Sequence, residues 1–192
     1  MVLKKTLIFF LTVFFNPSSS IDNFFQFKLP NLDNKIISFS NFKNNKATVI
    51  IYLLSDCPAT QSYTLTLNKL AKKYYENKIS FIGVFPGTYS TDDELQKFKR
   101  QYKIIFPLLK DPEMILAKLL NAKVGPSCFL INENGNIVYK GRIDDWLYAV
   151  GKKRQVITEN NLEDALKAVI NNLPVKISET NPIGCILEYD RK

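Results

Sequence analysis

The chain has 192 residues, and its hydrophobic and charged fractions of 46% and 23% are those of a globular protein with one ordinary domain. Histidine is absent, which excludes Ser-His-Asp triads, Cys-His pairs, and metal or haem sites with imidazole ligands. The net charge of +8 arises from basic residues scattered among acidic ones, a pattern typical of a solvated surface. We therefore expect no nucleic-acid partner, no metal and no other cofactor.

The first twenty residues have the three-part layout of a secretory signal peptide. Lys4 and Lys5 form a short basic stretch, residues 6–15 are apolar, and residues 16–20 are small and polar. The apolar run is shorter than the roughly 20 residues that a transmembrane helix needs. We predict cleavage near Ser20 and an exported, periplasmic protein without a stable membrane anchor, in a compartment where disulfides persist.

The domain itself is expected over residues 21–173, with residues 174–192 as an extended tail. Residues 25–39 contain two alternating stretches around a turn, which predicts an N-terminal β-hairpin. Residues 47–54 form a continuous apolar run, typical of a central strand buried on both faces. Apolar side chains then recur at helical spacing over residues 58–76, and the proline at 58 suits the first helical turn.

The middle of the chain alternates strands and helices. Residues 79–85 are predicted as a second buried strand, and Thr91 with Glu94 forms a capping box at the start of a helix. Residues 106–109 are predicted as a short strand. Asp111 and the proline after it are expected to open a helix that runs through Leu120.

The last part of the domain supplies a hairpin and a helix. Residues 124–132 and 136–140 are predicted strands, joined around the turn dipeptide Asn134-Gly135. Residues 162–169 carry the last helical pattern. This order of elements predicts the α/β class, with a mixed sheet sandwiched by helices.

Cys57 lies where a central strand gives way to a helix N-terminus. Backbone N–H groups and the positive end of the helix dipole stabilise a thiolate at such a position. The thiolate is the nucleophilic form of cysteine. This setting favours a reactive Cys57, and a buried structural cysteine is the alternative.

Several segments carry a resemblance to a known family: Phe27-Lys-Leu-Pro-Asn-Leu-Asp-Asn-Lys35, Ser55-Asp-Cys-Pro58, Val124-Gly-Pro-Ser-Cys-Phe-Leu-Ile131 and the Asn-Gly hairpin. Over residues 25–172 the chain resembles the redoxin branch of the thioredoxin-like superfamily. That branch includes alkyl hydroperoxide reductase and thiol-specific antioxidant relatives and exported thiol-disulfide oxidoreductases. More narrowly, the chain is similar to a bacterial peroxiredoxin-like subgroup through three further stretches: Tyr139–Asp145, Gly151–Arg154 and Thr180–Cys185.

The resemblance implies a thioredoxin-like fold and assigns two residues. Cys57 falls at the position of the attacking cysteine. Pro126 falls at the position of the loop proline that is cis in these folds, where backbone groups face the cysteine and are available to an extended partner peptide. An ordinary strand-edge proline is the alternative for Pro126.

Three positions depart from the two familiar mechanisms. Thr60 replaces the second cysteine of the Cys-x-x-Cys motif of thioredoxins. Ile50 and Leu54 replace the proline and threonine of the peroxiredoxin motif Pro-x-x-x-Thr-x-x-Cys. Without the threonine hydroxyl to orient a peroxide, efficient peroxidase activity is not expected.

A second thiol must then come from elsewhere in the chain. Cys185, after Gly184 in the tail, is the candidate that resolves a mixed disulfide or a sulfenic acid on Cys57. Alternatively, a Cys57–Cys185 disulfide is a purely structural link, which would add about 4 to 5 kcal/mol in the chain-entropy model. Cys128 is expected to be a core thiol.

Two classes of function stay open. The first is a thiol-disulfide oxidoreductase or weak thiol peroxidase acting through Cys57 on protein thiols, disulfides or peroxide, with an unidentified thiol reductant. The second is a non-catalytic module that binds a partner protein. A copper-delivery protein is disfavoured because no histidine and no nearby second cysteine accompany Cys57.

Polar residues after the strand at 136–140 are further candidates. Arg142, Asp144 and Asp145 could orient a ligand, although we expect a surface ion pair at the turn. Lys152, Lys153 and Arg154 are expected in a solvated loop that could attract an acidic partner.

Overall fold

A computed structural model describes residues 24–189 of the chain, so the predicted signal peptide lies outside the described residues. Within residues 24–189, no helix combines the length and apolar character needed to cross a membrane. The helices are α1 (Pro58–Lys73), α2 (Asp92–Gln101), α3 (Ile115–Leu120) and α4 (Asn161–Ile170), with 3-10 turns at Phe24–Gln26, Phe39–Phe42 and Tyr75–Asn77.

The main sheet has five strands in the order β5-β4-β3-β7-β8. Strands β3, β4 and β5 are parallel to one another, and β7 and β8 run antiparallel to their neighbours. The bounds are β3 (Ala47–Tyr52), β4 (Ile79–Pro86), β5 (Leu108–Asp111), β7 (Ser127–Asn132) and β8 (Ile137–Gly141). The prediction of a mixed sheet is therefore confirmed.

Within residues 24–189, three smaller pairings surround the sheet or extend from it. β1 (Lys28–Pro30) pairs antiparallel with β2 (Ile36–Ser38) and forms the predicted N-terminal hairpin. β9 (Leu147–Ala149) pairs with β10 (Lys152–Lys153). β6 (Val124–Gly125) pairs with β11 (Cys185–Ile186), which brings the C-terminal tail back to the domain.

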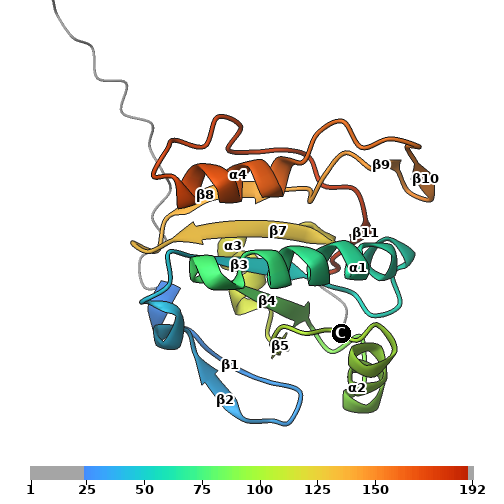
Figure 1. Ribbon diagram of the computed structural model, residues 1–192. Coiled ribbons are helices and arrows are strands. Elements are labelled where there is room, and N and C mark those ends of the chain that lie inside the picture. The colour runs from blue at the N-terminus through green and yellow to red at the C-terminus, as the bar shows by residue number, and fades with distance from the viewer. Residues whose placement is uncertain (1–23, 190–192) are drawn as a thin grey trace, which may run out of the picture.

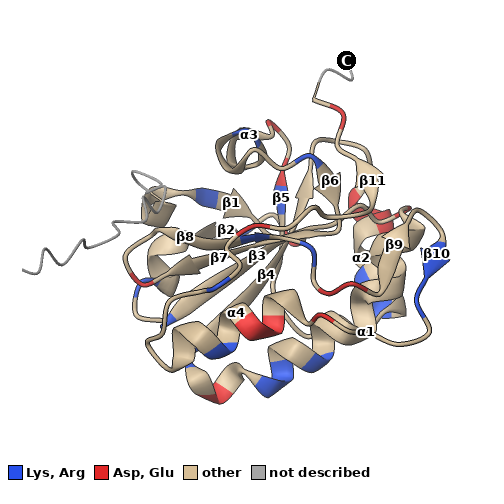
Figure 2. Ribbon diagram, turned by 90° about the horizontal axis from the view of Figure 1, so that it is seen from above, with Lys and Arg blue, Asp and Glu red and all other residues tan. Residues whose placement is uncertain are grey.

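Helices cover both faces of the sheet (Figure 1), with α1 and α4 over one face and α3 over the other. Every residue of β3 is buried, as its apolar sequence predicts. The charged residues of α1 are all lysines, whereas α4 carries residues of both signs (Figure 2), and Lys73 of α1 pairs with Glu163 of α4 at 2.5 Å. The predicted mixture of charges on a solvated surface therefore holds for these two helices taken together.

Helix α2 begins with the predicted capping box. The Glu94 amide donates to the Thr91 hydroxyl at 3.3 Å, and the Thr91 amide donates to the Glu94 carboxylate at 2.8 Å. These bonds satisfy donors that a helix N-terminus otherwise leaves without partners.

Helix α3 begins later than predicted. Asp111 is the last residue of β5, and Met114 has a left-handed backbone with φ of 54°, so the helix starts only at Ile115. The Asp111 carboxylate still caps the helix, because it accepts the amides of Ile115 and Ala117 at 3.0 and 2.8 Å. The prediction had the correct capping residue and the wrong first residue of the helix.

Candidate active site at Cys57 and the C-terminal tail

Cys57 is the N-cap residue of α1. Its backbone is extended, with φ of −78° and ψ of 119°, and Pro58 takes the first helical position. The Gln61 amide donates to the Cys57 carbonyl at 3.0 Å and starts the helix. The predicted junction between a buried strand and a helix N-terminus is confirmed. This junction directs the free N–H groups of the first helical turn toward the cysteine.

Cys57 is bonded to Cys185 through a disulfide, although the two residues are 128 positions apart. Their Cα atoms are separated by 6.1 Å, a usual separation for a disulfide. Cys57 is only 2% exposed, whereas Cys185 is partly exposed. An external thiol would therefore reach the sulfur of Cys185 more readily than that of Cys57.

The loop at Pro126 completes the site. The Gly125–Pro126 peptide bond is cis, as the family resemblance implies. Gly125 lies opposite Cys185 in the pairing of β6 with β11, and its carbonyl oxygen is 3.5 Å from the Cys57 sulfur. The structure therefore brings together all three candidate site residues: Cys57, Pro126 and Cys185.

The tail is attached to the domain beyond the disulfide as well. The Leu187 amide donates to the Lys123 carbonyl at 2.9 Å, and the Tyr89 hydroxyl donates to the Glu188 carbonyl. The Tyr189 hydroxyl donates to the carbonyls of Ala117, at 3.1 Å, and of Ala122. Sequence analysis placed Cys185 in an extended tail, and the structure adds that this tail contributes a short strand that pairs with β6.

Gly184 is named in the sequence analysis only as the residue before Cys185, and the structure gives it a role in the site. A Cβ atom at Gly184 would overlap the carbonyl group of Gly125, so only glycine allows this approach of the two backbones. The glycine directly before a cysteine was the available signal in the sequence. The role of Gly184 depends on the strand β6 that faces it, and local sequence patterns do not reveal that strand.

Two positions that depart from the family motifs have defined roles in packing. Thr60 is fully buried, and its hydroxyl accepts the Leu54 amide at 3.3 Å. Leu54 is also buried and offers no hydroxyl. Thr60 therefore holds the loop before Cys57, and neither residue supplies the second thiol or the peroxide-orienting group that the motifs contain.

Cys128 is a buried core thiol, as expected. Its sulfur lies 3.3 Å from the Gly141 carbonyl oxygen, and burial raises the pKa of the thiol far above its ordinary value. It lies in β7 opposite Ile51 of β3. Because the thiolate is the reactive form, Cys128 is unsuited to be a nucleophile.

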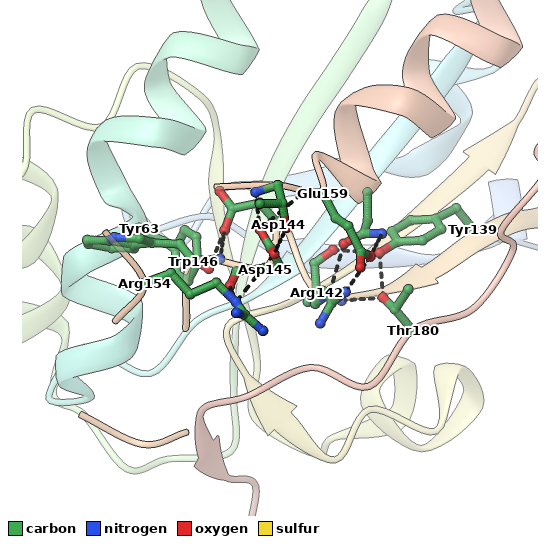
Figure 3. A network of polar contacts seen from close by, with 11 residues as sticks. Tyr63, Tyr139, Arg142, Asp144, Asp145, Trp146, Arg154, Glu159 and Thr180 are labelled. Atoms are coloured by element: carbon green, nitrogen blue, oxygen red, sulfur yellow. Dashed lines mark hydrogen bonds and ion pairs between the residues drawn. The ribbon is translucent and has the colours of Figure 1, made fainter. Parts of the chain in front are cut away.

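The polar residues after β8 form a network (Figure 3) in which the expected surface ion pair is only one part, because two of its carboxyls are buried. Asp144 and Asp145 are both buried. Asp144 accepts the Tyr63 hydroxyl at 2.6 Å, and Arg142 pairs with Glu159 at 2.6 Å. The correction has a physical cause, since the turn folds under residues 158–161, which supply partners that a surface turn lacks.

The two neighbouring carboxyls titrate in opposite directions. Burial raises the pKa of Asp144 above its ordinary 3.8. Hydrogen bonds from Thr158 lower the pKa of Asp145 to about 2, helped by the Glu159 amide and the charge of Arg154. Asp145 therefore contributes stability that is present above pH 3.8 and is lost as the pH falls toward 2. Asp144 opposes this trend, because the fold favours its protonated form.

We expect Asp145→Asn and Asp144→Asn to affect stability differently. The Asp145 replacement loses charge-assisted hydrogen bonds, so it should lower the free energy of unfolding by about 1.5 to 3 kcal/mol at pH 7. The free energy of unfolding should also depend less on pH between pH 5 and 2. The Asp144 replacement keeps both bonds, because the Tyr63 hydroxyl and the Trp146 amide donate to the same Asp144 oxygen. Urea unfolding at several pH values measures both effects, and equal losses at pH 7 would contradict this assignment.

The fold and the site together define a thioredoxin-like protein with a cysteine-based site at a strand-to-helix junction and a loop that contains a cis proline. Residues 21–140 match the AhpC/TSA family. This match covers more than half of the chain, and the protein belongs to that family.

Two curated relatives are similar to the chain. A glutathione peroxidase-like peroxiredoxin of Candida albicans is 29% identical over 50% of this chain and 58% of its own length, so the chain spans little more than half of that protein. A probable glutathione peroxidase 8 of Mus musculus is 26% identical over 88% of this chain and 79% of its own length.

Solved structures support the fold. A hypothetical protein from Sinorhizobium meliloti aligns with a TM-score of 0.78 at 23% identity, over 86% of this chain and 92% of that chain. A secreted disulfide oxidoreductase of Mycobacterium tuberculosis aligns with a TM-score of 0.55 at 16% identity, over 78% of this chain and 97% of that chain. At these identities the comparisons establish the thioredoxin-like fold.

Proposed function

We propose that the protein is a thiol-disulfide oxidoreductase in which Cys57 and Cys185 form the redox pair. The observation that carries the proposal is the disulfide between a helix N-cap cysteine and a cysteine that pairs beside the cis-proline loop. The helix N-terminus stabilises the Cys57 thiolate, which makes it both a nucleophile and a good leaving group. The structure then corresponds to the oxidised state of the enzyme.

The reaction has two exchange steps on the substrate side. The Cys57 thiolate attacks one sulfur of a partner disulfide, a mixed disulfide forms, and the other partner sulfur leaves as a thiolate. The Cys185 thiolate then attacks the Cys57 sulfur and releases the second partner thiolate. The partner gains two electrons and, at neutral pH, two protons, and the enzyme is left with the Cys57–Cys185 disulfide.

An external thiol reductant resets the enzyme. Its thiolate attacks the more exposed sulfur of Cys185 and releases the Cys57 thiolate, and a second reductant thiol then frees Cys185 as the reductant disulfide forms. The difference in exposure between the two cysteines supports this order of events.

Three variants test the proposal with a disulfide-bonded peptide as substrate and a dithiol as reductant. Cys57→Ser should abolish turnover, and Cys185→Ser, reduced beforehand and freed of the dithiol, should accumulate a one-to-one mixed disulfide that is visible by intact mass. Cys128→Ala is the matched control and should keep the parent rate, because Cys128 is a buried thiol with a raised pKa and takes no part in the disulfide. Parent-like turnover by Cys57→Ser would disprove the proposal.

A thiol peroxidase is the second candidate, and the names of the two curated relatives favour it. The Cys57 thiolate would attack a hydroperoxide and give a sulfenic acid and an alcohol, and the Cys185 thiol would then displace water to form the same disulfide. Leu54 offers no hydroxyl to orient the peroxide. We therefore expect peroxide to oxidise the reduced protein more slowly than a peptide disulfide does, as stopped-flow tryptophan fluorescence can measure.

We further propose that the protein is exported to the periplasm, with residues 1–20 as a cleaved signal peptide and residues 174–192 as a tail that belongs functionally to the domain. The basic, apolar and small segments of the first twenty residues support export, and so does a disulfide between distant residues. Intact mass of the periplasmic fraction tests the cleavage site.

A further inference from the structure

The C-terminal tail lies along β6 in the manner of a bound peptide. Its side chains alternate, with Ile186 74% exposed and Leu187 only 3% exposed. Glu188 is exposed and Tyr189 is partly buried. The tail therefore directs the side chains of three alternate residues toward the domain: Cys185, Leu187 and Tyr189.

Three features fix the tail in this position beyond ordinary strand pairing. Gly184 passes the Gly125 carbonyl at a distance that excludes any side chain. Leu187 is buried at the register position where its amide pairs with Lys123. The Tyr189 hydroxyl reaches two carbonyls around the end of α3, and the Lys123 ammonium lies 5.9 Å from its ring centre.

A second anchor holds the chain upstream of this segment. The Thr180 amide donates to the Lys140 carbonyl at 3.0 Å, and the Thr180 and Tyr139 hydroxyls are 2.6 Å apart. This anchor uses β8 and not β6. Residues 184–189 can therefore leave β6 without disturbing the attachment of Thr180.

We propose that β6 and the sites of Leu187 and Tyr189 select the partner protein. The surface fits an extended segment in which a glycine precedes the reactive cysteine, a large aliphatic residue follows two positions later, and an aromatic residue follows four positions later. The partner segment and the tail occupy the surface in turn. This inference rests on the proposed function, since a partner sulfur must bond to Cys57 in the place that Cys185 vacates.

The tail and the partner segment must occupy β6 in turn because of the geometry of the mixed disulfide. A partner cysteine bonded to Cys57 needs the position opposite Gly125, because the tail shows how an extended chain reaches the Cys57 sulfur there. The tail and the partner cannot both pair with β6 at that position. Return of the tail therefore displaces the partner strand at the moment when Cys185 resolves the mixed disulfide.

The test uses the peptide Gly-Cys-Ile-Leu-Glu-Tyr, whose cysteine carries thionitrobenzoate in a mixed disulfide. The full-length Cys185→Ser chain, with Cys57 reduced, should take up the peptide and release one coloured thionitrobenzoate, with no net oxidation in the exchange. The tail then carries no competing thiol. It still competes equally with every peptide, so rates can be compared between peptides.

Peptides with alanine in place of the leucine or the tyrosine should each react at least about 10-fold more slowly, as expected for the loss of one buried contact. Alanine in place of the glycine should slow the reaction at least as much, because its Cβ would overlap the Gly125 carbonyl. Alanine in place of the isoleucine is the matched control and should leave the rate within about 2-fold, because the equivalent Ile186 is exposed. The reduced unmodified chain should give the same ranking in its first turnover, which guards against a folding defect of the variant.

The outcomes distinguish the proposed function from the proposed selection of partners by β6. Fast and equal release from all the peptides would overturn the selection by β6 and leave the proposed function intact. No release from any peptide, nor from the free dithiobis-nitrobenzoate, would overturn the proposed function and this inference together. The expected ranking, with the isoleucine control unchanged, supports both.

Discussion

Reducing the Cys57–Cys185 disulfide should lower the free energy of unfolding by up to about 5 kcal/mol, the largest stability effect expected for this chain. The disulfide closes a loop between residues 128 positions apart. In the chain-entropy model so long a loop removes much of the conformational freedom of the unfolded chain. Strain in the folded protein or residual structure in the unfolded chain would reduce the effect.

Urea unfolding with and without a dithiol measures this difference. Cys185→Ser should match the reduced parent and should not respond to the dithiol. Cys128→Ala should keep the full response, because its disulfide is intact. A parent protein with the same midpoint in both redox states would contradict the prediction, as would a Cys185→Ser variant that the dithiol destabilises.

A stabilising disulfide and a catalytic one are compatible here. The structural alternative for Cys57 and Cys185 predicts a bond that thiols reach slowly, whereas the catalytic one predicts fast exchange at the partly exposed Cys185. The stability measurement therefore reports how much the link contributes, and the rate of exchange decides whether the link turns over.

The parts of the fold that depend on local patterns could be predicted from the sequence. The apolar run of β3, the helix that begins at Pro58 and the Asn134-Gly135 hairpin each carry their own signal within a few residues. The position of Cys57 follows from two such signals, because it lies between the strand and the helix. This is why Cys57 could be predicted as the candidate nucleophile without knowledge of the tertiary structure.

The rest of the site depends on contacts between distant segments. β6 and β11 are two residues long each, too short for any periodicity, and their pairing joins residues about sixty positions apart. The burial of Asp144 and Asp145 likewise depends on partners beyond the turn, such as Thr158. The start of α3 was wrong because the pairing of Asp111 with Pro86 in the sheet overrides a good local helix signal.

Gly184→Ala should weaken the hold of the tail, and so of Cys185, beside Cys57, while all three cysteines remain in the chain. The added Cβ would overlap the Gly125 carbonyl carbon and oxygen, which are backbone atoms and cannot move as a side chain can. Overpacking of this kind costs about 1 to 3 kcal/mol, or roughly a 5-fold to 150-fold change in an equilibrium. The Cys57–Cys185 disulfide should be that much easier to reduce in a glutathione buffer.

Alkylation and intact mass across a series of glutathione ratios give the equilibrium constant of the disulfide in each variant. Ile186→Ala is the matched control, since Ile186 is next to Cys185 but its side chain is 74% exposed. We expect this control to titrate like the parent. The Gly184 variant should also keep more of the mixed disulfide with a peptide substrate, because Cys185 returns to Cys57 less readily. If Gly184→Ala titrates like the parent, the close passage of the tail along β6 is not what holds Cys185 beside Cys57.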